Sequence, residues 1–129
     1  MIHFRIRGQC PSKKSAQQII KVKGNTRLIP NKLYVKWEKP AIEQLKEQME
    51  EKDLSTIDYP IWVKCIIYRN TKRKIDKLNM EQSVHDVLEK AGVIENDFLI
   101  ECTDGSRRIL GVTKEEAHVD IFIYPFSCQ

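Results

Sequence analysis

The feature that most constrains the fold is a change in apolar period along the chain. Between residues 31 and 52, apolar side chains recur at steps of three and four residues, which predicts an amphipathic helix. Near the end of the chain, Val119, Ile121 and Ile123 form one side of an alternating pattern, which predicts a strand in a sheet with unequal faces. Both periods in one short chain predict an α+β fold, with a small mixed β-sheet and two main helices.

The remaining elements follow from apolar runs and from the residues that interrupt them. Gly24 and Asn25 are a two-residue hairpin signal, and Gly92 is expected to end the second helix. Pro40 lies inside the first helical pattern and is expected to kink that helix or split it into two pieces. The predicted strands cover residues 2–7, 60–69, 98–103 and 117–124, two short extended runs cover 17–23 and 26–30, and the helices cover 31–52 and 79–91.

The length of 129 residues suits one domain over residues 1–129. The sequence has no apolar run of about 18 residues, so we expect no transmembrane helix and no membrane partner. The opening residues resemble a strand and lack the apolar core of a signal peptide. We therefore expect a cytoplasmic protein.

Four polar residues around the second predicted helix suggest a cation site. Asp76 and Asn79 open the helix, Asp86 follows Asn79 by two turns on the same side, and Asp97 follows the turn after Gly92. Oxygen donors of this kind favour Mg²⁺ or Mn²⁺ over zinc. We expect Asp76 and Asp97 as metal ligands and Asp86 as a further catalytic acid, with Asn79 in support.

The same residues also allow a purely structural interpretation. Asp76 or Asn79 would then be a helix N-cap, and Asp86 would lie on a solvated face. Asp97 would meet Asp76 only if the turn after the helix lies along the helix, or if a second subunit contributes. His85, next to Asp86, could carry a proton or position a water, although a surface histidine is the simpler interpretation.

Basic residues gather before the acidic helix. Residues 1–75 carry 17 Lys/Arg and 7 Asp/Glu, whereas residues 76–129 carry 5 and 11. A basic half attracts phosphate, although uneven charge can also arise by chance, and a lysine-rich loop can serve solubility alone. The residues expected to contact DNA phosphates are Lys13, Lys14, Arg69, Lys72, Arg73, Lys74 and Lys77.

Several of these motifs occur together in one known family. The chain resembles the RusA family of phage and bacterial Holliday-junction resolvases over most of its length. The resemblance begins with an opening strand and G-x-x-P-x-K-K, and continues through L-I-P-N-K-x-Y-x-x-W. It is most specific where the family has an acid, an Asn at the helix start, an Asp in mid-helix and L-x-x-x-G-[VI]-I-x-[DN]-D. The matching residues here are Asp76, Asn79, Asp86, Leu88, Gly92, Val93, Ile94, Asn96 and Asp97.

The resemblance implies a small α+β fold that acts as a homodimer on four-way DNA junctions. It implies Mg²⁺-dependent cleavage of branched DNA by paired cuts in recombination and repair, and a phage or prophage setting. A two-fold dimer suits a junction because two equivalent strands meet two equivalent sites. On the same basis, Asp76 and Asp97 correspond to metal-binding acids and the basic loops hold the DNA backbone.

Three positions depart from the family pattern. Leu78 stands where the family has a second acid, Gln82 stands where it has a lysine, and Asn96 replaces the first member of the last acid pair. Fewer ligands imply weaker metal binding, or a ligand recruited from elsewhere, such as Glu81 or Glu101.

The sequence thus leads to one main functional hypothesis and two alternatives. The main hypothesis is a metal-dependent endonuclease for branched DNA. The first alternative is a catalytically degenerate DNA-binding or structural module of the same fold. The second is a protein-interaction domain with no affinity for nucleic acid, whose binding would not depend on salt.

Overall fold

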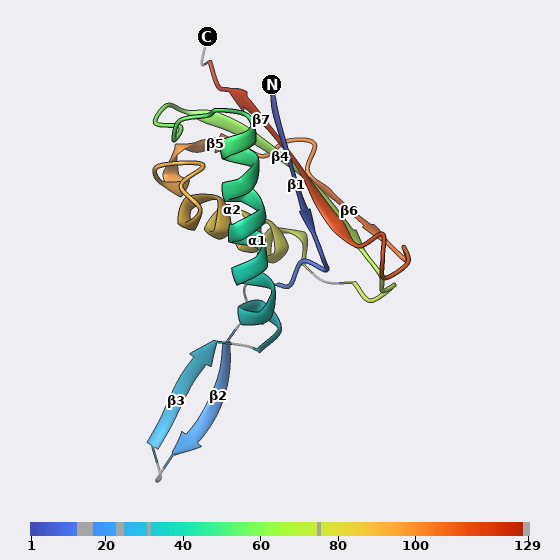
Figure 1. Ribbon diagram of the computed structural model, residues 1–129. Coiled ribbons are helices and arrows are strands. Elements are labelled where there is room, and N and C mark those ends of the chain that lie inside the picture. Colours follow the sequence, from blue (N-terminus) through green and yellow to red (C-terminus); the bar gives the residue numbers. More distant parts are fainter. Residues whose placement is uncertain (13–16, 23–24, 31, 75, 128–129) are drawn as a thin grey trace.

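The chain folds as a five-stranded mixed sheet with two helices, which confirms the predicted α+β class (Figure 1). The computed structural model describes residues 1–12, 17–22, 25–30, 32–74 and 76–127, with backbone alone for 17–22 and 25–30. The strands of the sheet are β1 (Ile2–Arg7), β4 (Ile61–Arg69), β5 (Ile100–Cys102), β6 (Arg107–Leu110) and β7 (His118–Pro125). The helices are α1 (Lys32–Glu51) and α2 (Lys77–Lys90). None of the described helices is long and apolar enough to cross a membrane.

The final strand lies in the middle of the sheet. β7 pairs antiparallel with β1 on one side and with β4 on the other. β5 and β6 both pair with the far edge of β4, and both run parallel to it. The alternation near the end of the chain therefore marks the central strand, with Val119, Ile121 and Ile123 buried as expected.

The first helix confirms its predicted apolar stripe. Tyr34, Trp37, Ala41 and Leu45 are buried, and α1 continues unbroken past Pro40, so the helix is not split there. Proline removes one backbone donor, and the buried stripe on both sides holds the helix together despite that loss.

Two glutamines of α1 pair with the backbone of β1. Gln48 accepts from the Arg5 N–H at 2.8 Å and donates to the Arg5 carbonyl at 2.7 Å. Gln44 accepts from the Arg7 N–H at 2.8 Å. These side chains satisfy groups that an edge strand would otherwise present to another chain. This function of the two glutamines was not apparent from the sequence.

A separate hairpin precedes α1. β2 (Gln17–Val22) and β3 (Asn25–Pro30) pair antiparallel, which confirms the two predicted extended runs as a hairpin. Figure 1 shows this hairpin beyond the start of α1, away from the five-stranded sheet. Gly24 and Asn31, the first residue of the predicted helix 31–52, lie outside the described residues.

The elements after β4 differ from the prediction at their boundaries. α2 begins at Lys77, two residues before Asn79, because Asp76 acts as its N-cap. The predicted strand 98–103 begins as a one-turn 3-10 helix, η2 (Asp97–Leu99), and only Ile100–Cys102 form a strand. β6 was not predicted at all, since Arg107 and Arg108 resemble a polar loop in the sequence.

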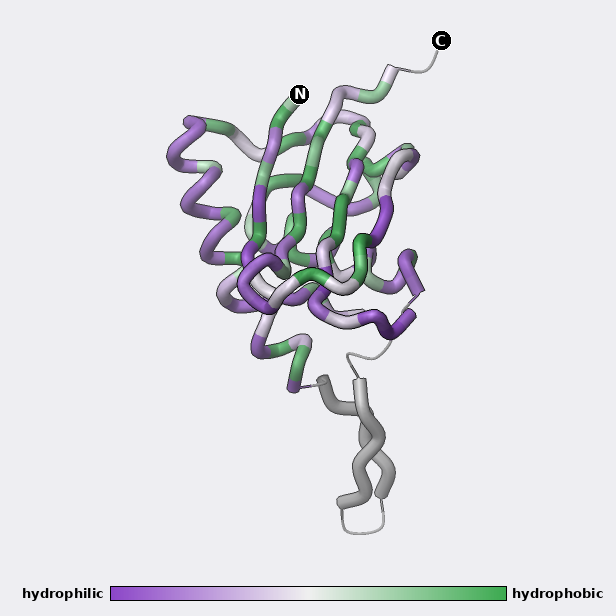
Figure 2. Tube along the Cα trace, turned by 90° about the vertical axis from the view of Figure 1, so that its right-hand side faces the viewer, coloured by the Kyte–Doolittle hydropathy of each residue, from purple (hydrophilic) through white to green (hydrophobic). Residues whose placement is uncertain are grey.

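Both helices pack on one face of the sheet, and no described element covers the other face. Inward residues of β1, β4 and β7 form one core with α1 and α2. We call the opposite side the outer face, defined by the cross-strand rows His3–Phe122–Lys64 and Trp62–Tyr124. Its rings stack in pairs, with centroids 4.8 Å apart for His3–Phe122 and 4.7 Å apart for Trp62–Tyr124. Figure 2 shows the resulting alternation of hydrophilic and hydrophobic residues along the strands.

Candidate functional site

The site begins with Asp76, which lies exposed at the start of α2. Its carboxylate accepts from the Leu78 N–H at 2.9 Å, which is the interaction of a helix N-cap. The cap uses Oδ1, so one carboxylate oxygen is tied to the helix. The structural interpretation of Asp76 is therefore correct, and any role as a ligand would be additional to the cap.

The chain after α2 turns back along the helix. Gly92 adopts φ +76°, and the Glu95 N–H then donates to the Ile57 carbonyl at 2.9 Å. The Asp97 N–H donates to Oε1 of Glu89 at 3.3 Å, so Asp97 lies beside the second half of α2. This is the arrangement under which Asp97 could approach the acids of α2 within one subunit.

Asp97 is exposed, and its carboxylate has no hydrogen-bond partner among the described residues. The charge of Asp97 acts on His85, whose pKa is altered. Burial lowers the pKa of His85 to about 4, and the charge of Asp97 opposes that shift without cancelling it. Nε2 of His85 is buried and has no partner among the described residues. His85 is therefore a half-buried neutral histidine facing an acid, which the sequence alone did not indicate.

Asp86 lies on a different side of α2, where α2 meets α1. It accepts from the Tyr34 hydroxyl and lies 3.1 Å from Nζ of Lys90. Lys90 also binds Glu38 at 2.6 Å. Burial, followed by the hydrogen bonds to Asp86 and Glu38, raises the pKa of Tyr34. These contacts connect the two helices, so Asp86 has a structural role whether or not it also acts in catalysis.

The described residues contain no group of three or more acids, histidines or cysteines placed to share a metal ion. Asp76 precedes α2, whereas Asp97 lies beside His85, nine residues further on, or about 13 Å of helix. Two carboxylates completed by substrate phosphate are a donor set that Mg²⁺ accepts, so the chemistry of Asp76 and Asp97 suits that ion. Within one subunit the two acids lie too far apart to share one ion, and the described residues complete no group of three donors around either acid.

Two of the three residues that depart from the family pattern lie on the exposed side of α2, and the third, Asn96, is the N-cap of η2. Leu78 is 62% exposed, and Gln82, one turn later, is exposed as well. Glu81, in contrast, is buried: it is 2% exposed, and its Oε1 has no hydrogen-bond partner among the described residues. Asn79 is half-buried. Glu101 is exposed on β5.

Apart from Arg69, the basic residues expected to contact DNA divide into three groups. Lys72, Arg73 and Lys74 are exposed in the loop between β4 and α2, as contact with phosphate requires. Lys77 is half-buried, and its Nζ donates to the Ser106 carbonyl at 3.1 Å. Lys13 and Lys14 lie outside the described residues.

Arg69 differs from the expectation. It is 6% exposed at the end of β4, and its Nε and Nη1 have no partner among the described residues. Burial lowers its pKa, with a smaller opposing effect of Cys10. The apolar strand that carries Arg69 draws it into the protein, so a direct contact with DNA is not favoured by its position.

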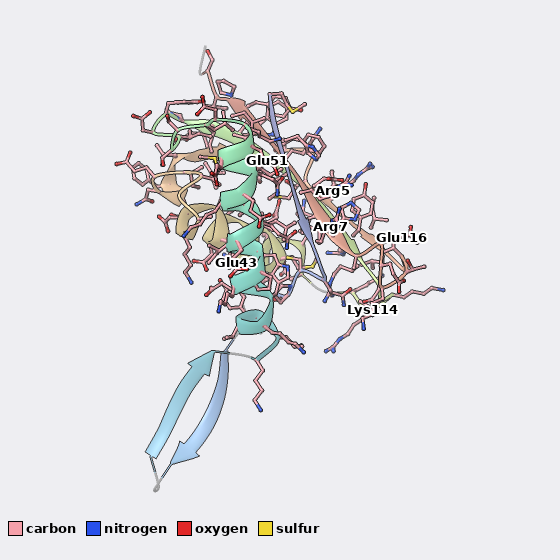
Figure 3. The ribbon with its side chains drawn as sticks, viewed as in Figure 1. Arg5, Arg7, Glu43, Glu51, Lys114 and Glu116 are labelled. Atoms are coloured by element: carbon pink, nitrogen blue, oxygen red, sulfur yellow. The ribbon has the colours of Figure 1, made fainter. Side chains whose placement is uncertain are left out.

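A second charged cluster lies on the outer face of the sheet. Asp120 accepts from Nε of Arg5 at 2.9 Å and contacts Nε2 of His3 at 2.9 Å and Nε2 of His118 at 3.2 Å. Figure 3 labels Arg5 and Arg7 on the side of β1 away from α1, whereas Glu43 and Glu51 lie on α1. The sequence showed these residues only as the polar half of an alternating pattern, because their partners come from opposite ends of the chain.

Comparison with known proteins adds to this geometry. A scan against protein-family models gives no match. The chain is 47% identical over 64 residues to the crossover junction endodeoxyribonuclease RusA of Aquifex aeolicus (strain VF5). The chain is homologous to RusA over this segment. The segment is 50% of this chain and 48% of the relative, so the chain spans about half the length of the curated relative it matches.

The homology confirms the resemblance to RusA. It agrees with the α+β class seen in the structure. It does not test the individual site residues, because an identity over a whole segment does not assign a role to any one position.

Proposed function

We propose that this chain binds branched DNA and cleaves its phosphodiesters in a Mg²⁺-dependent reaction. The observation that carries the proposal is the 47% identity to a protein named as a crossover junction endodeoxyribonuclease. The exposed cations Lys72, Arg73 and Lys74, directly before the exposed acid Asp76, support it, because phosphates and a cation would meet at one end of α2.

In this proposal, Asp76 and Asp97 would each hold Mg²⁺ or Mn²⁺ together with substrate phosphate, because about 13 Å of helix separates them within one subunit, or the second subunit of a dimer would bring the two acids together. Such an ion activates the attacking water and stabilises the leaving oxygen of a phosphodiester. The chain itself would orient the DNA: Lys72, Arg73 and Lys74 would bind phosphates, and Lys77 would fix the start of α2 against the turn at Ser106. Asn79 and Gln82 would support the site from the same helix.

The proposal includes one domain and a cytoplasmic homodimer on a four-way junction. A two-fold dimer would present two equivalent sites to two equivalent strands, which paired cuts require. Light scattering of the free protein and of its junction complex would test this part. A monomer in both states would contradict it.

The first test is incubation with a synthetic mobile four-way junction and with linear duplex of the same sequence, in Mg²⁺, Mn²⁺ or EDTA. We expect metal-dependent, paired nicks in the junction alone. Asp76→Asn and Asp97→Asn should each reduce nicking at least about 100-fold while junction binding persists. Glu95→Gln is the matched control, since Glu95 is an exposed acid two residues before Asp97. Nicking that survives both Asp→Asn changes would show that the site is elsewhere.

A second candidate function is junction binding without cleavage. It is favoured by the exposed Leu78 in the place of the usual acid, and by the lack of a third donor among the described residues. Here the wild-type protein would bind junctions tightly and cut in neither metal. Leu78→Asp, alone and with Gln82→Lys, separates the two candidates because the change is on an exposed helix position and should leave the fold intact. Nicking that appears only in these variants would identify a degenerate site.

A further inference from the structure

An exposed phenylalanine stands next to the candidate ligand Asp97. Phe98 is 72% exposed, the highest value among the large apolar residues whose side chains the structure describes. The predicted strand would have packed Phe98 into a sheet, but the structure places it in η2, outside the sheet. A single exposed apolar residue needs no explanation by itself. Phe98 differs from an ordinary exposed residue because its backbone is held by hydrogen bonds and because it directly follows Asp97.

The backbone of Phe98 is fixed from three sides. Its N–H donates to Oδ1 of Asn96 at 3.0 Å, and the preceding N–H, of Asp97, donates to Oε1 of Glu89. The following residue, Leu99, is buried, and its N–H donates to the Asn96 carbonyl at 3.2 Å. The ring is therefore carried by a supported turn, and a contact that it makes loses little backbone freedom.

The position of the ring selects among possible partners. Phe98 directly follows Asp97 beside the second half of α2, whereas the exposed Leu78 and the cations of residues 72–74 lie at the start of the same helix. DNA offers both a flat apolar surface, in an unstacked base, and phosphates for the cations. A second copy of this chain fits less well, because the same face would place Asp97 and Glu95 opposite the same acids.

We infer that Phe98 stacks on a base of the bound DNA at the branch point. This inference rests on the proposed function. Where a junction is held open, the base pairs at its centre end their stacks, so a base face is accessible there and absent along linear duplex. Aromatic side chains bind such faces, and apolar side chains also enter opened base steps. Phe98 would act as a positioning residue that sets which phosphate lies beside Asp97.

The test uses a four-way junction with 2-aminopurine at the branch point, read by fluorescence and by binding anisotropy. Phe98→Ala should weaken junction binding about tenfold, abolish the fluorescence change on binding, and leave duplex binding unchanged. Phe98→Trp should restore both signals. Phe126→Ala is the matched control, since Phe126 is an exposed phenylalanine beyond β7.

Each remaining outcome bears on the inference. Phe98→Ala that binds junctions and changes the fluorescence like wild type overturns it while leaving the proposed function intact. Wild-type protein that binds no junction overturns both. Loss of self-association by Phe98→Ala, with unchanged junction binding, would instead assign the ring to a contact between two copies of this chain.

Discussion

Asp120 and Asp97 are both acids next to histidines, but their surroundings differ. Asp120 lies in the sheet, and Arg5, His3 and His118 surround its carboxylate. Burial alone would raise the pKa of Asp120, but hydrogen bonds from these three residues outweigh burial and lower the pKa. Asp97 is exposed and its carboxylate has no partner among the described residues. Asp120 therefore stabilises the sheet, whereas Asp97 retains its full capacity to bind something else.

The two histidines show the same contrast. Nδ1 of His118 lies 2.6 Å from the Glu116 carbonyl, and its Nε2 contacts Asp120. Nε2 of His85 is buried without a described partner. Buried polar groups in proteins are nearly always satisfied, so an exception near a candidate site indicates function more strongly than a saturated cluster does.

The largest effect on the free energy of unfolding is expected for Asp120, whose carboxylate is fully hydrogen-bonded, when its charge is removed. Asp120→Asn should lower the free energy of unfolding by about 2 to 3 kcal/mol, because Arg5 and both histidines lose an ionised acceptor. Asp97→Asn should change it by less than about 0.5 kcal/mol. Urea unfolding at pH 7 measures both. Equal losses would mean that Asp97 also has a structural role.

The pKa of Asp120 adds a pH signature to this comparison. Its folded pKa lies below the ordinary value of 3.8, so its stabilisation is complete above that pH and is lost as pH falls through the lower, folded value. The unfolding free energy of Asp120→Asn should therefore fall less than that of wild type below pH 3.8.

A smaller effect, and one limited to acid pH, is expected at His85. The unfolded chain takes up a proton near pH 6.5, whereas folded His85 does so only at about 4. Stability should therefore fall as pH drops from 6.5 to 4, by about 2 kcal/mol at pH 5. His85→Gln should remove this loss. A pH profile that His85→Gln does not alter would show that wild-type His85 protonates freely in the fold.

Asp86 tests whether a partnered acid of α2 can also be catalytic. Asp86→Asn should cost about 1 kcal/mol of unfolding free energy, because it weakens the contacts with Tyr34 and Lys90. If its role is only structural, nicking of a junction persists. Glu43→Gln, on the exposed side of α1, is the control. Loss of nicking without loss of stability would show that Asp86 acts in catalysis, as the sequence analysis expected.

The smallest effect concerns single cations. Lys72→Ala should reduce the slope of log binding constant against log salt concentration by about 1, as expected for one phosphate contact. Arg5→Ala should leave the slope unchanged, because Asp120 already binds Arg5. Anisotropy of a labelled junction over a salt series measures both slopes. A slope reduced by Arg5→Ala and unchanged by Lys72→Ala would indicate that DNA binds at the outer face of the sheet.

Local patterns determined much of the fold. The stripe from Tyr34 to Leu45 defined α1, and the alternation from Val119 to Ile123 defined β7, because burial on one side imposes a period that the sequence records. The resemblance to RusA likewise followed from the order and spacing of residues around α2, and the 47% identity over 64 residues agrees with it. The strand β6 escaped prediction because Arg107 and Arg108 pair with β4 through backbone hydrogen bonds, which leave no apolar pattern.

Tertiary structure decided what each acid does. The sequence shows four aspartates of identical chemistry, Asp76, Asp86, Asp97 and Asp120. Spacing along the chain predicted positions on α2 for only the first two. In the folded chain, Asp86 accepts a hydrogen bond from Tyr34, and Arg5 and His3, from the other end of the chain, contact Asp120. Asp97 stays exposed, and its charge acts on His85. Charge and hydrogen bonding act through space, so the partners of a carboxylate depend on which distant segments the sheet and helices bring within about 3 Å.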